Sequence, residues 1–197
     1  MNTILLENDV VQLRPIELGD VEGILEAASD QQVWVHMSDT LLTGAAVLDY
    51  TEKAVKEREA GQSHRFVIIS KETGRIIGST TFFDISPAHK RLEIGYTWLN
   101  PNYWRTNINT NCKYLLLMYC FEQWGMHRVQ IKTDHENLRS QKAIERIGAT
   151  KEGVLRNHMI RKDGTTRHTV MYSITKEEWP EMKRNFEEKL LAHSPTL

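Results

Sequence analysis

The sequence lacks any apolar run of the roughly 20 residues that a membrane-spanning helix needs. Its N-terminal segment has neither the basic start nor the apolar core of a signal peptide. Cysteine is scarce: Cys112 and Cys120 lie on one expected helix, about 12 Å apart at the usual rise per residue, which is too far for a disulfide between them. Nothing points to a membrane or to export, so we expect a cytoplasmic protein.

An excess of charge of either sign is also absent. Lysine and arginine number 25, aspartate and glutamate number 26, and the two signs are interspersed along the chain. This balance argues against a surface that coats nucleic acid. No spacing among the eight histidines and two cysteines fits a metal site. Without repeats or low-complexity segments, the 197 residues suit a single domain, 1–197, with a sizeable core and a loose tail at 194–197.

What the sequence does contain, between Leu92 and Trp124, is an expected strand, a polar loop and a buried helix in direct succession. The strand residues alternate in polarity, and this periodicity places on one face Leu92, Ile94, Tyr96 and Trp98. The loop holds Pro, Asn and Thr, which favour turns and helix caps. The apolar run that follows has helical spacing on two faces, so we expect this helix to be buried.

The start of that helix is a candidate anion site. The first amides of a helix have no partner within it and carry the positive end of its dipole, so a loop that delivers them beside a strand end suits a phosphate. Arg105 and Lys113 would add positive charge. A glycine-rich phosphate signature is absent, and most turns of this kind bind nothing, so from these residues alone both interpretations stay open.

Hydrophobic spacing and turn residues predict the other elements. Strands are expected at 10–14, 66–70, 75–83, 128–132, 149–161 and 166–174. Helices are expected at 20–29, 31–37, 43–59, 137–147 and about 176–193. Asp163-Gly164 predicts a hairpin turn, and Gly148 ends a helix. Hairpins beside strand–helix units indicate an α/β (α+β mixed) domain whose mixed sheet carries helices on both faces.

This order of elements resembles that of the GNAT superfamily of N-acetyltransferases, and most closely its RimJ/RimL-type branch. The resemblance spans nearly the whole chain. Its most specific motifs are Glu93-Ile94-Gly95-Tyr96, Asn137-Leu138-Arg139-Ser140, Ile147-Gly148-Ala149 with Glu152-Gly153, and the closing hairpin. The resemblance implies a GNAT-like, mostly antiparallel seven-stranded sheet flanked by helices on both faces, and acetyl-CoA as cosubstrate without a metal.

In this family the strand–loop–helix unit binds acetyl-CoA, with the pantetheine arm along the strand and the pyrophosphate on the loop amides. The resemblance therefore implies cofactor contacts from Tyr96, Trp98, Trp104, Arg105, Thr106, Asn107, Ile108, Asn109 and Thr110. By residue type alone, Tyr96 and Trp98 are core residues. The usual loop glycines are absent, and Asn107 and Asn109 replace them. Asparagine tolerates a left-handed backbone, so the departure bears on affinity more than on the existence of the site.

The Asn137 motif has two interpretations. By residue chemistry alone, Asn137 is a helix N-cap and Ser140 a polar first-turn residue. The resemblance implies that Asn137 holds the pantetheine amides and that Ser140 lies near the thiol. The superfamily commonly places a proton-donating Tyr seven residues after the Asn, but here that residue is Ile144. Because a hydroxyl can donate a hydrogen bond to sulfur, Ser140 is the candidate catalytic residue for the leaving group.

Glu93 is the candidate general base. An ammonium has no lone pair, so the attacking amine must first lose a proton, directly or through water. Glu93 lies mid-strand, opposite the apolar stripe and near the expected pantetheine arm. The alternative is a structural carboxylate, solvated or paired with Arg91 or Lys90.

The expected function is transfer of the acetyl group of acetyl-CoA directly to a primary amine, on a protein N-terminus such as that of a ribosomal protein or on a small molecule. Two alternatives are a catalytically impaired CoA-binding or regulatory module and an unrelated α/β interaction domain. The expected partners are acetyl-CoA and the amine, without nucleic acid or membrane, in a monomer or homodimer. The composition of residues 31–59 and of the closing hairpin does not identify the acceptor.

Overall fold

The computed structural model describes residues 4–191. The strands are β1 (Leu6–Glu7), β2 (Val11–Pro15), β3 (His64–Ser70), β4 (Ile76–Ser86), β5 (Arg91–Leu99), β6 (Arg128–Asp134), β7 (Thr150–Ile160) and β8 (Thr166–Thr175). The α-helices are α1 (Val21–Ala27), α2 (Gly44–Glu59), α3 (Ile108–Met118), α4 (Leu138–Arg146) and α5 (Trp179–Asn185). Short 3-10 and π segments are η1 (Leu18–Asp20), η2 (Gln31–Trp34), η3 (Pro101–Tyr103), η4 (Tyr119–Gln123) and η5 (Phe186–Leu191).

The strands form one sheet in the order β1-β2-β3-β4-β5-β6-β8-β7. Every neighbouring pair is antiparallel except β5 and β6, which run parallel. The mixed, mostly antiparallel sheet is confirmed. It has eight strands where seven were predicted, because β1 spans two residues and is too short to show a period. The last helix begins at Trp179 rather than near residue 176, and the predicted tail at 194–197 lies outside the described residues.

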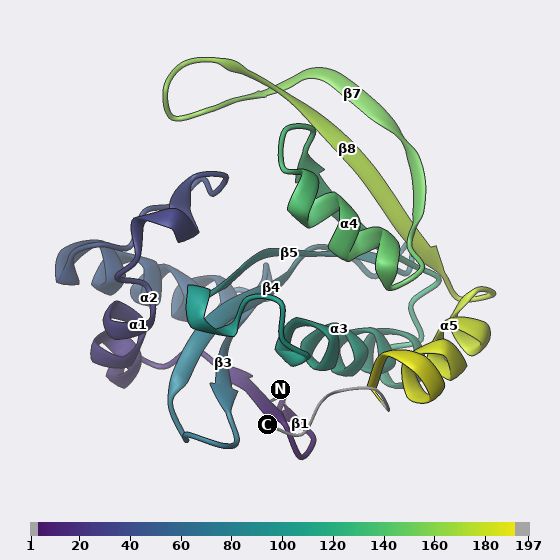
Figure 1. The fold of residues 1–197 in the computed structure, drawn as a ribbon, viewed down its shortest axis with the longest axis horizontal. Coiled ribbons are helices and arrows are strands. Elements are labelled where there is room, and N and C mark those ends of the chain that lie inside the picture. The colour runs from purple at the N-terminus through teal and green to yellow at the C-terminus, as the bar shows by residue number, and fades with distance from the viewer. Residues whose placement is uncertain (1–3, 192–197) are drawn as a thin grey trace.

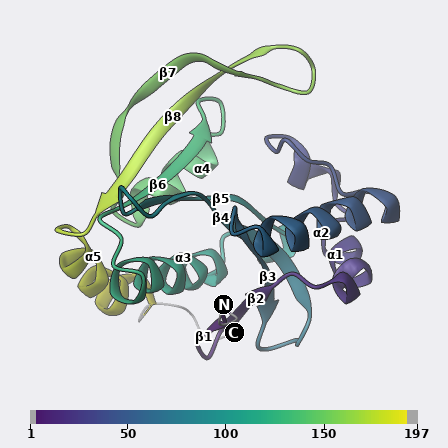
Figure 2. The same ribbon diagram turned by 180° about the vertical axis from the view of Figure 1, so that it is seen from behind.

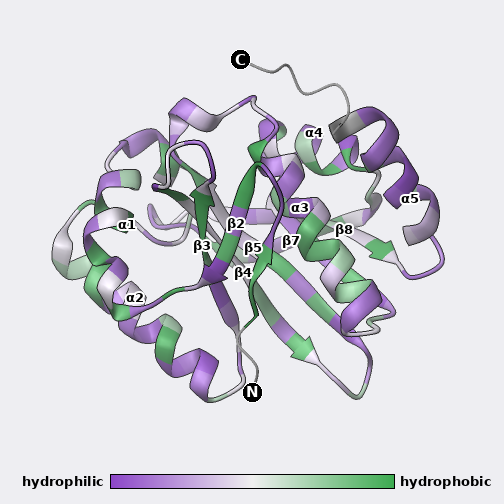
Figure 3. Cartoon of the chain, turned by 90° about the horizontal axis from the view of Figure 1, so that it is seen from below, coloured by the Kyte–Doolittle hydropathy of each residue, from purple (hydrophilic) through white to green (hydrophobic). Residues whose placement is uncertain are grey.

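Helices cover both faces of the sheet (Figures 1 and 2). Consecutive side chains of β3 face opposite sides of the sheet. Val67 shares a buried cluster with Ile24 of α1. Ile68 shares another cluster with Leu116 of α3 and Met182 of α5. Figure 3 shows hydrophobic residues recurring along α3 and the central strands. Each helix therefore buries its apolar stripe against the sheet. Within residues 4–191, no helix combines the length and hydrophobicity that a membrane span requires.

Local sequence signals fix several element ends. The Thr43 hydroxyl accepts a hydrogen bond from the Ala46 amide at 3.2 Å and so caps α2. Gly148, with φ +93°, follows the C-terminus of α4, and Gly164, with φ +82°, lies in the β7–β8 turn. These observations confirm the predicted helix stop and the predicted hairpin.

The β7–β8 hairpin arches over α4 (Figures 1 and 2). Near its tip, Lys162 donates hydrogen bonds to the Asp39 carbonyl and to the Thr40 hydroxyl, in the segment before α2. The hairpin and the segment before α2, far apart in sequence, therefore meet.

Candidate active site

Strands β5 and β6 part soon after they meet. Their parallel ladder covers three residue pairs, from Arg91 with Arg128 to Glu93 with Gln130. Beyond Glu93, no described strand pairs with that edge of β5, while β6 continues along β8. The remaining amides and carbonyls of this edge are therefore available to an extended ligand, which could add to β5 as a further strand does.

A β-bulge in β5 changes which face its side chains occupy. The register with β4 passes from Gly95 opposite Thr81 to Trp98 opposite Ser79, so Tyr96 and Thr97 together oppose one residue. Tyr96 has φ +49°, a left-handed conformation that is uncommon for a bulky residue. An extra residue in a strand sends later side chains to the opposite face.

The predicted common face of β5 is therefore wrong after Ile94. Ile94 lies in the cluster with α3, whereas Trp98 lies in the cluster with α1 and α2, with its ring 5.3 Å from that of Trp34. Trp98 is 4% exposed, so its side chain is core and only its backbone can meet a cofactor. Tyr96 is not core as its residue type suggested: it is 39% exposed, with its ring 4.8 Å from that of Phe83.

The loop before α3 presents free backbone amides. The amides of Arg105, Thr106, Asn107, Asn109 and Thr110 make no hydrogen bond to any other residue of the described chain. The left-handed residue is Arg105, with φ +64°, and not Asn107, which is helical at φ −76°. Asn107 does not cap the helix with its side chain. The loop thus turns without glycine, at an arginine.

Helix α4 lies against this loop and against the start of α3. The Arg139 guanidinium stacks on the Trp104 ring at 3.7 Å, and Arg146 Nη2 donates to Thr110 Oγ1 at 2.8 Å. Trp104 is itself fixed by a hydrogen bond from its indole nitrogen to the Leu99 carbonyl at 2.9 Å. Burial and the nearby charge of Arg105 lower the pKa of Arg139. Positive charge therefore gathers beside the free amides.

Lys113 does not contribute to this charge as the sequence suggested. It is 6% exposed, and Nζ donates to Thr97 Oγ1 at 3.1 Å behind the bulge. Burial lowers the pKa of Lys113 to about 8.

Asn137 caps α4, because its side-chain oxygen accepts a hydrogen bond from the Ser140 amide at 3.0 Å. The Ser140 hydroxyl makes no hydrogen bond to any residue between 4 and 191. Ile144 is 5% exposed and packs in the core. The stacking of Arg139 on Trp104 therefore holds the loop before α3 against the end of α4 that carries Asn137 and Ser140.

Glu93 is buried, with 3% of its side chain exposed. Its partner is Lys132 of β6, whose Nζ lies 2.6 Å from Glu93 Oε2. The sequence suggested Arg91 or Lys90 instead, but Arg91 pairs with Asp84. Burial raises the pKa of Glu93, and Lys132 partly opposes that rise. The sequence alone did not reveal Lys132 as a partner. The parallel register places Glu93 beside Gln130, and Lys132, two residues further along β6, lies on the same face as both.

A second buried carboxylate lies at the end of β6. Asp134 accepts hydrogen bonds from Arg161 Nε at 2.8 Å and Nη2 at 2.9 Å. Burial alone would raise the pKa of Asp134, but the bonds from Arg161 and from the Glu136 amide outweigh it and lower the pKa to about 2. Asp134 is therefore a permanently charged partner of Arg161, unsuited to act as a base near neutral pH.

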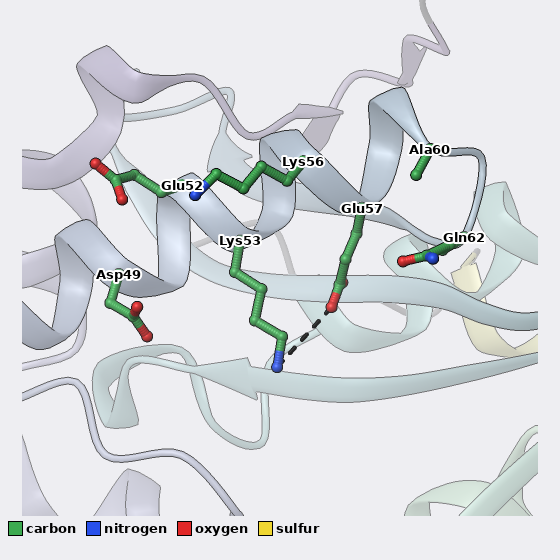
Figure 4. Close-up of a pocket in the computed structure, with 7 residues that line it drawn as sticks. All are labelled: Asp49, Glu52, Lys53, Lys56, Glu57, Ala60 and Gln62. Carbon is green, nitrogen blue, oxygen red and sulfur yellow. Dashed lines mark ion pairs between the residues drawn. The ribbon is translucent and has the colours of Figure 1, made fainter.

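A hollow on α2 lies outside this arrangement (Figure 4). It is lined by Asp49, Glu52, Lys53, Lys56, Glu57, Ala60 and Gln62, which come from one helix and the turn after it. Its charged side chains include the pair Lys53–Glu57 at 3.9 Å. None of its residues belongs to β5, β6, α3 or α4. In residues 4–191, no three His, Cys, Asp or Glu side chains lie together as metal ligands would.

Comparison with known proteins assigns the arrangement to a family. The acetyltransferase (GNAT) domain profile matches residues 11–150. The chain belongs to the GNAT acetyltransferase family. It is 31% identical over 180 residues to a Bacillus licheniformis protein named uncharacterized N-acetyltransferase p20, covering 91% of this chain and 99% of that protein. This GNAT enzyme is therefore an acyl-CoA-dependent N-acetyltransferase, and the interaction-domain alternative is wrong.

Solved structures agree with the family. The chain is similar to a GCN5-related N-acetyltransferase from Brucella melitensis, with a TM-score of 0.87 and 27% identity over 96% of this chain and 86% of that one. It shares its fold with ribosomal-protein-S5-alanine acetyltransferase from Vibrio fischeri, with a TM-score of 0.76 and 18% identity over 89% of this chain and 98% of that one. GNAT acetyltransferases take the acetyl group from acetyl-CoA.

Proposed function

We propose that this GNAT acetyltransferase moves the acetyl group of acetyl-CoA directly to a primary amine that binds beside Glu93. The observation that carries the proposal is a single continuous unit. The unpaired edge of β5 begins at a buried carboxylate and leads into a loop of free amides flanked by arginines. Acetyl-CoA supplies the activated acetyl thioester.

The residues present fit this cosubstrate. The pyrophosphate of CoA is anionic, and the amides of Arg105, Thr106 and Asn107 offer donors with no competing acceptor in the described chain. The guanidinium groups of Arg105 and Arg139 add charge. The free edge of β5 suits the pantetheine amides, as does the Asn137 side-chain nitrogen, since only its oxygen is used by the helix cap.

Glu93 accepts the proton that the amine must lose. Its burial raises the pKa of its carboxyl toward the range in which a base works near neutral pH, and Lys132 opposes part of that rise by favouring the ionised form. Once the ammonium has given one proton to Glu93, the neutral nitrogen attacks the thioester carbon. The carbon–nitrogen bond forms, the carbon–sulfur bond breaks, and the electron pair of that bond leaves with the sulfur as a thiolate. The nitrogen loses a second proton as the amide forms, and uptake of a proton by the thiolate gives the CoA thiol. Ser140, whose hydroxyl is free, donates a hydrogen bond to that sulfur where other family members have a tyrosine.

The finer assignments belong to the same proposal. The Asn137 motif with Ser140 supports the RimJ/RimL-type branch, and the acceptor is a protein N-terminus or a small amine. We place the protein in the cytoplasm, as a monomer or homodimer that binds neither nucleic acid nor membrane. These assignments follow from the sequence features described above.

A thiol-release assay tests the proposal. Purified protein is mixed with acetyl-CoA and a panel of peptides, amino acids, polyamines and aminoglycosides, and free CoA is measured. Calorimetry with CoA and with pantetheine reports binding separately. Thiol release with one class of amine is expected, and CoA should bind at least 10-fold more tightly than pantetheine, because two or more phosphate contacts are lost with the fragment. Tight CoA binding without turnover for any amine would instead identify a catalytically impaired CoA-binding module.

A further inference from the structure

A row of charged side chains shares one face of the sheet with Glu93. Glu93 is in register with Gln130 of β6, and side chains two residues apart in a strand point to the same face, so Lys132 joins them. Lys132 is in register with Met171 of β8. Arg167 lies four residues before Met171 on that strand and therefore on the same face.

Most cations of this face have a close carboxylate. Lys132 contacts Glu93, Arg161 forms two hydrogen bonds with Asp134, and Arg128 forms two with Glu152. A close carboxylate occupies donors of each of these cations. They leave little to offer a ligand.

Arg167 differs from these cations. Its nearest carboxylate oxygen, Asp134 Oδ2, is 3.9 Å from Nε, beyond hydrogen-bond distance, and that oxygen already accepts Arg161 Nε at 2.8 Å. Arg167 Nε is buried without a hydrogen-bond partner, and the guanidinium donates no hydrogen bond to any residue from 4 to 191. A buried donor that lacks an acceptor is costly, so such a group signals a missing partner.

The position of Arg167 relates it to the reacting centre. It is close enough to Glu93 for its charge to favour the ionised carboxylate. Its side chain is 20% exposed, so a ligand can reach it. The guanidinium therefore lies within electrostatic range of the proposed base and remains open to solvent.

We infer that the acceptor is a small primary amine that carries a carboxylate, such as an amino acid, with Arg167 binding the carboxylate while the amine faces Glu93. The inference rests on the proposed function of the Glu93 site. A guanidinium presents paired donors that match the two oxygens of a carboxylate. Met159, which is opposite Arg167 on β7, is 42% exposed, so apolar surface beside Arg167 favours an acceptor with an apolar side chain.

Matched substrates test the inference. The value of kcat/KM is measured for leucine, methionine and phenylalanine and for the primary amide of each, which keeps the amine and the side chain but lacks the carboxylate. We expect the wild type to prefer at least one amino acid over its amide by about 10- to 100-fold, as a lost charge-assisted pair predicts. Arg167→Gln should abolish that preference. The value of kcat/KM should fall for the amino acid and should change by less than about 3-fold for the amide.

Control variants separate this role from others. Arg156→Gln removes an exposed arginine of β7 that makes no described ion pair, and it should preserve the preference. Arg167→Lys keeps the positive charge but lacks the paired donors of the guanidinium, so it should keep part of the preference for the amino acid over its amide. Equal losses for acid and amide in Arg167→Gln would show that Arg167 acts only through Glu93 or through folding and would overturn the inference. Acetylation of amides, peptides or polyamines in preference to amino acids would overturn it while leaving the proposed function intact.

Discussion

Replacing Lys113 by methionine is expected to stabilise the protein. Lys113 is 6% exposed and has one hydroxyl partner and no carboxylate partner among the described residues. Burial lowers its pKa from 10.5 to about 8, which corresponds to roughly 3 kcal/mol at about 1.4 kcal/mol per pKa unit. Methionine has a similar length and no charge, and loss of the bond to Thr97 costs about 1 kcal/mol. The net gain expected near pH 7 is therefore about 2 kcal/mol.

The gain should depend on pH in a defined direction. Because the folded-state pKa of Lys113 is below the unfolded value, folding carries the full penalty below about pH 8. The penalty shrinks as pH rises from about 8 to 10.5, where the folded protein has lost the proton that the unfolded chain retains. The stability difference between Lys113→Met and wild type should thus fall by about 2 kcal/mol between pH ~7 and ~9.5.

Urea unfolding of both proteins at these two pH values, without acetyl-CoA, measures the difference. Lys142→Met, at an exposed position of α4, is the control and should change stability by less than about 0.5 kcal/mol at either pH. A Lys113→Met variant that is less stable than wild type at both pH values by the same amount would refute the reasoning. Lys113 would then be a net stabilising residue whose charge is satisfied.

Two further predictions concern the site. Ser140→Ala should lower turnover by about 10- to 1000-fold with little change in acetyl-CoA affinity, because it removes a transition-state hydrogen bond of about 1.4–4 kcal/mol. Turnover at the wild-type rate would show that Ser140 is only a first-turn helix residue. Lys132→Met should raise the pKa of Glu93, since Lys132 opposes the rise caused by burial, and so move the acidic limb of the kcat/KM profile to higher pH. An acidic limb at an unchanged pH in that variant would mean that Glu93 does not control it.

Much of the fold can be predicted from the sequence, because the features that indicate its elements are local. Hydrophobic periodicity, the Gly148 helix stop and the Asp163-Gly164 turn each depend on a few neighbouring residues, and each is present in the structure. A candidate base and a candidate phosphate loop could also be proposed from the sequence, because strand, loop and helix follow one another directly.

The rest depends on contacts that the sequence does not display. Gly95, in the middle of the strand, is a local sign of the bulge at Tyr96, and alternation alone places Trp98 on the wrong face. The left-handed residue of the loop is Arg105, although asparagine is the better candidate by type. The Glu93–Lys132 pair requires the register of two parallel strands that are joined through a helix. Long-range register, rather than local propensity, thus decides which cation lies beside Glu93 and places Arg167 on the same face of the sheet.

The most direct test of the central claim is the rate of Glu93→Gln with two kinds of amine. The substitution keeps the shape of the side chain and removes its basicity. The rate with an alkylamine acceptor should fall, and its alkaline shoulder should then follow the pKa of the amine itself. An acceptor that is already unprotonated at neutral pH, an aniline or a hydrazine, should lose much less, because it needs no base for its first proton. Equal losses for both kinds of amine would contradict the assignment of Glu93 as the proton acceptor.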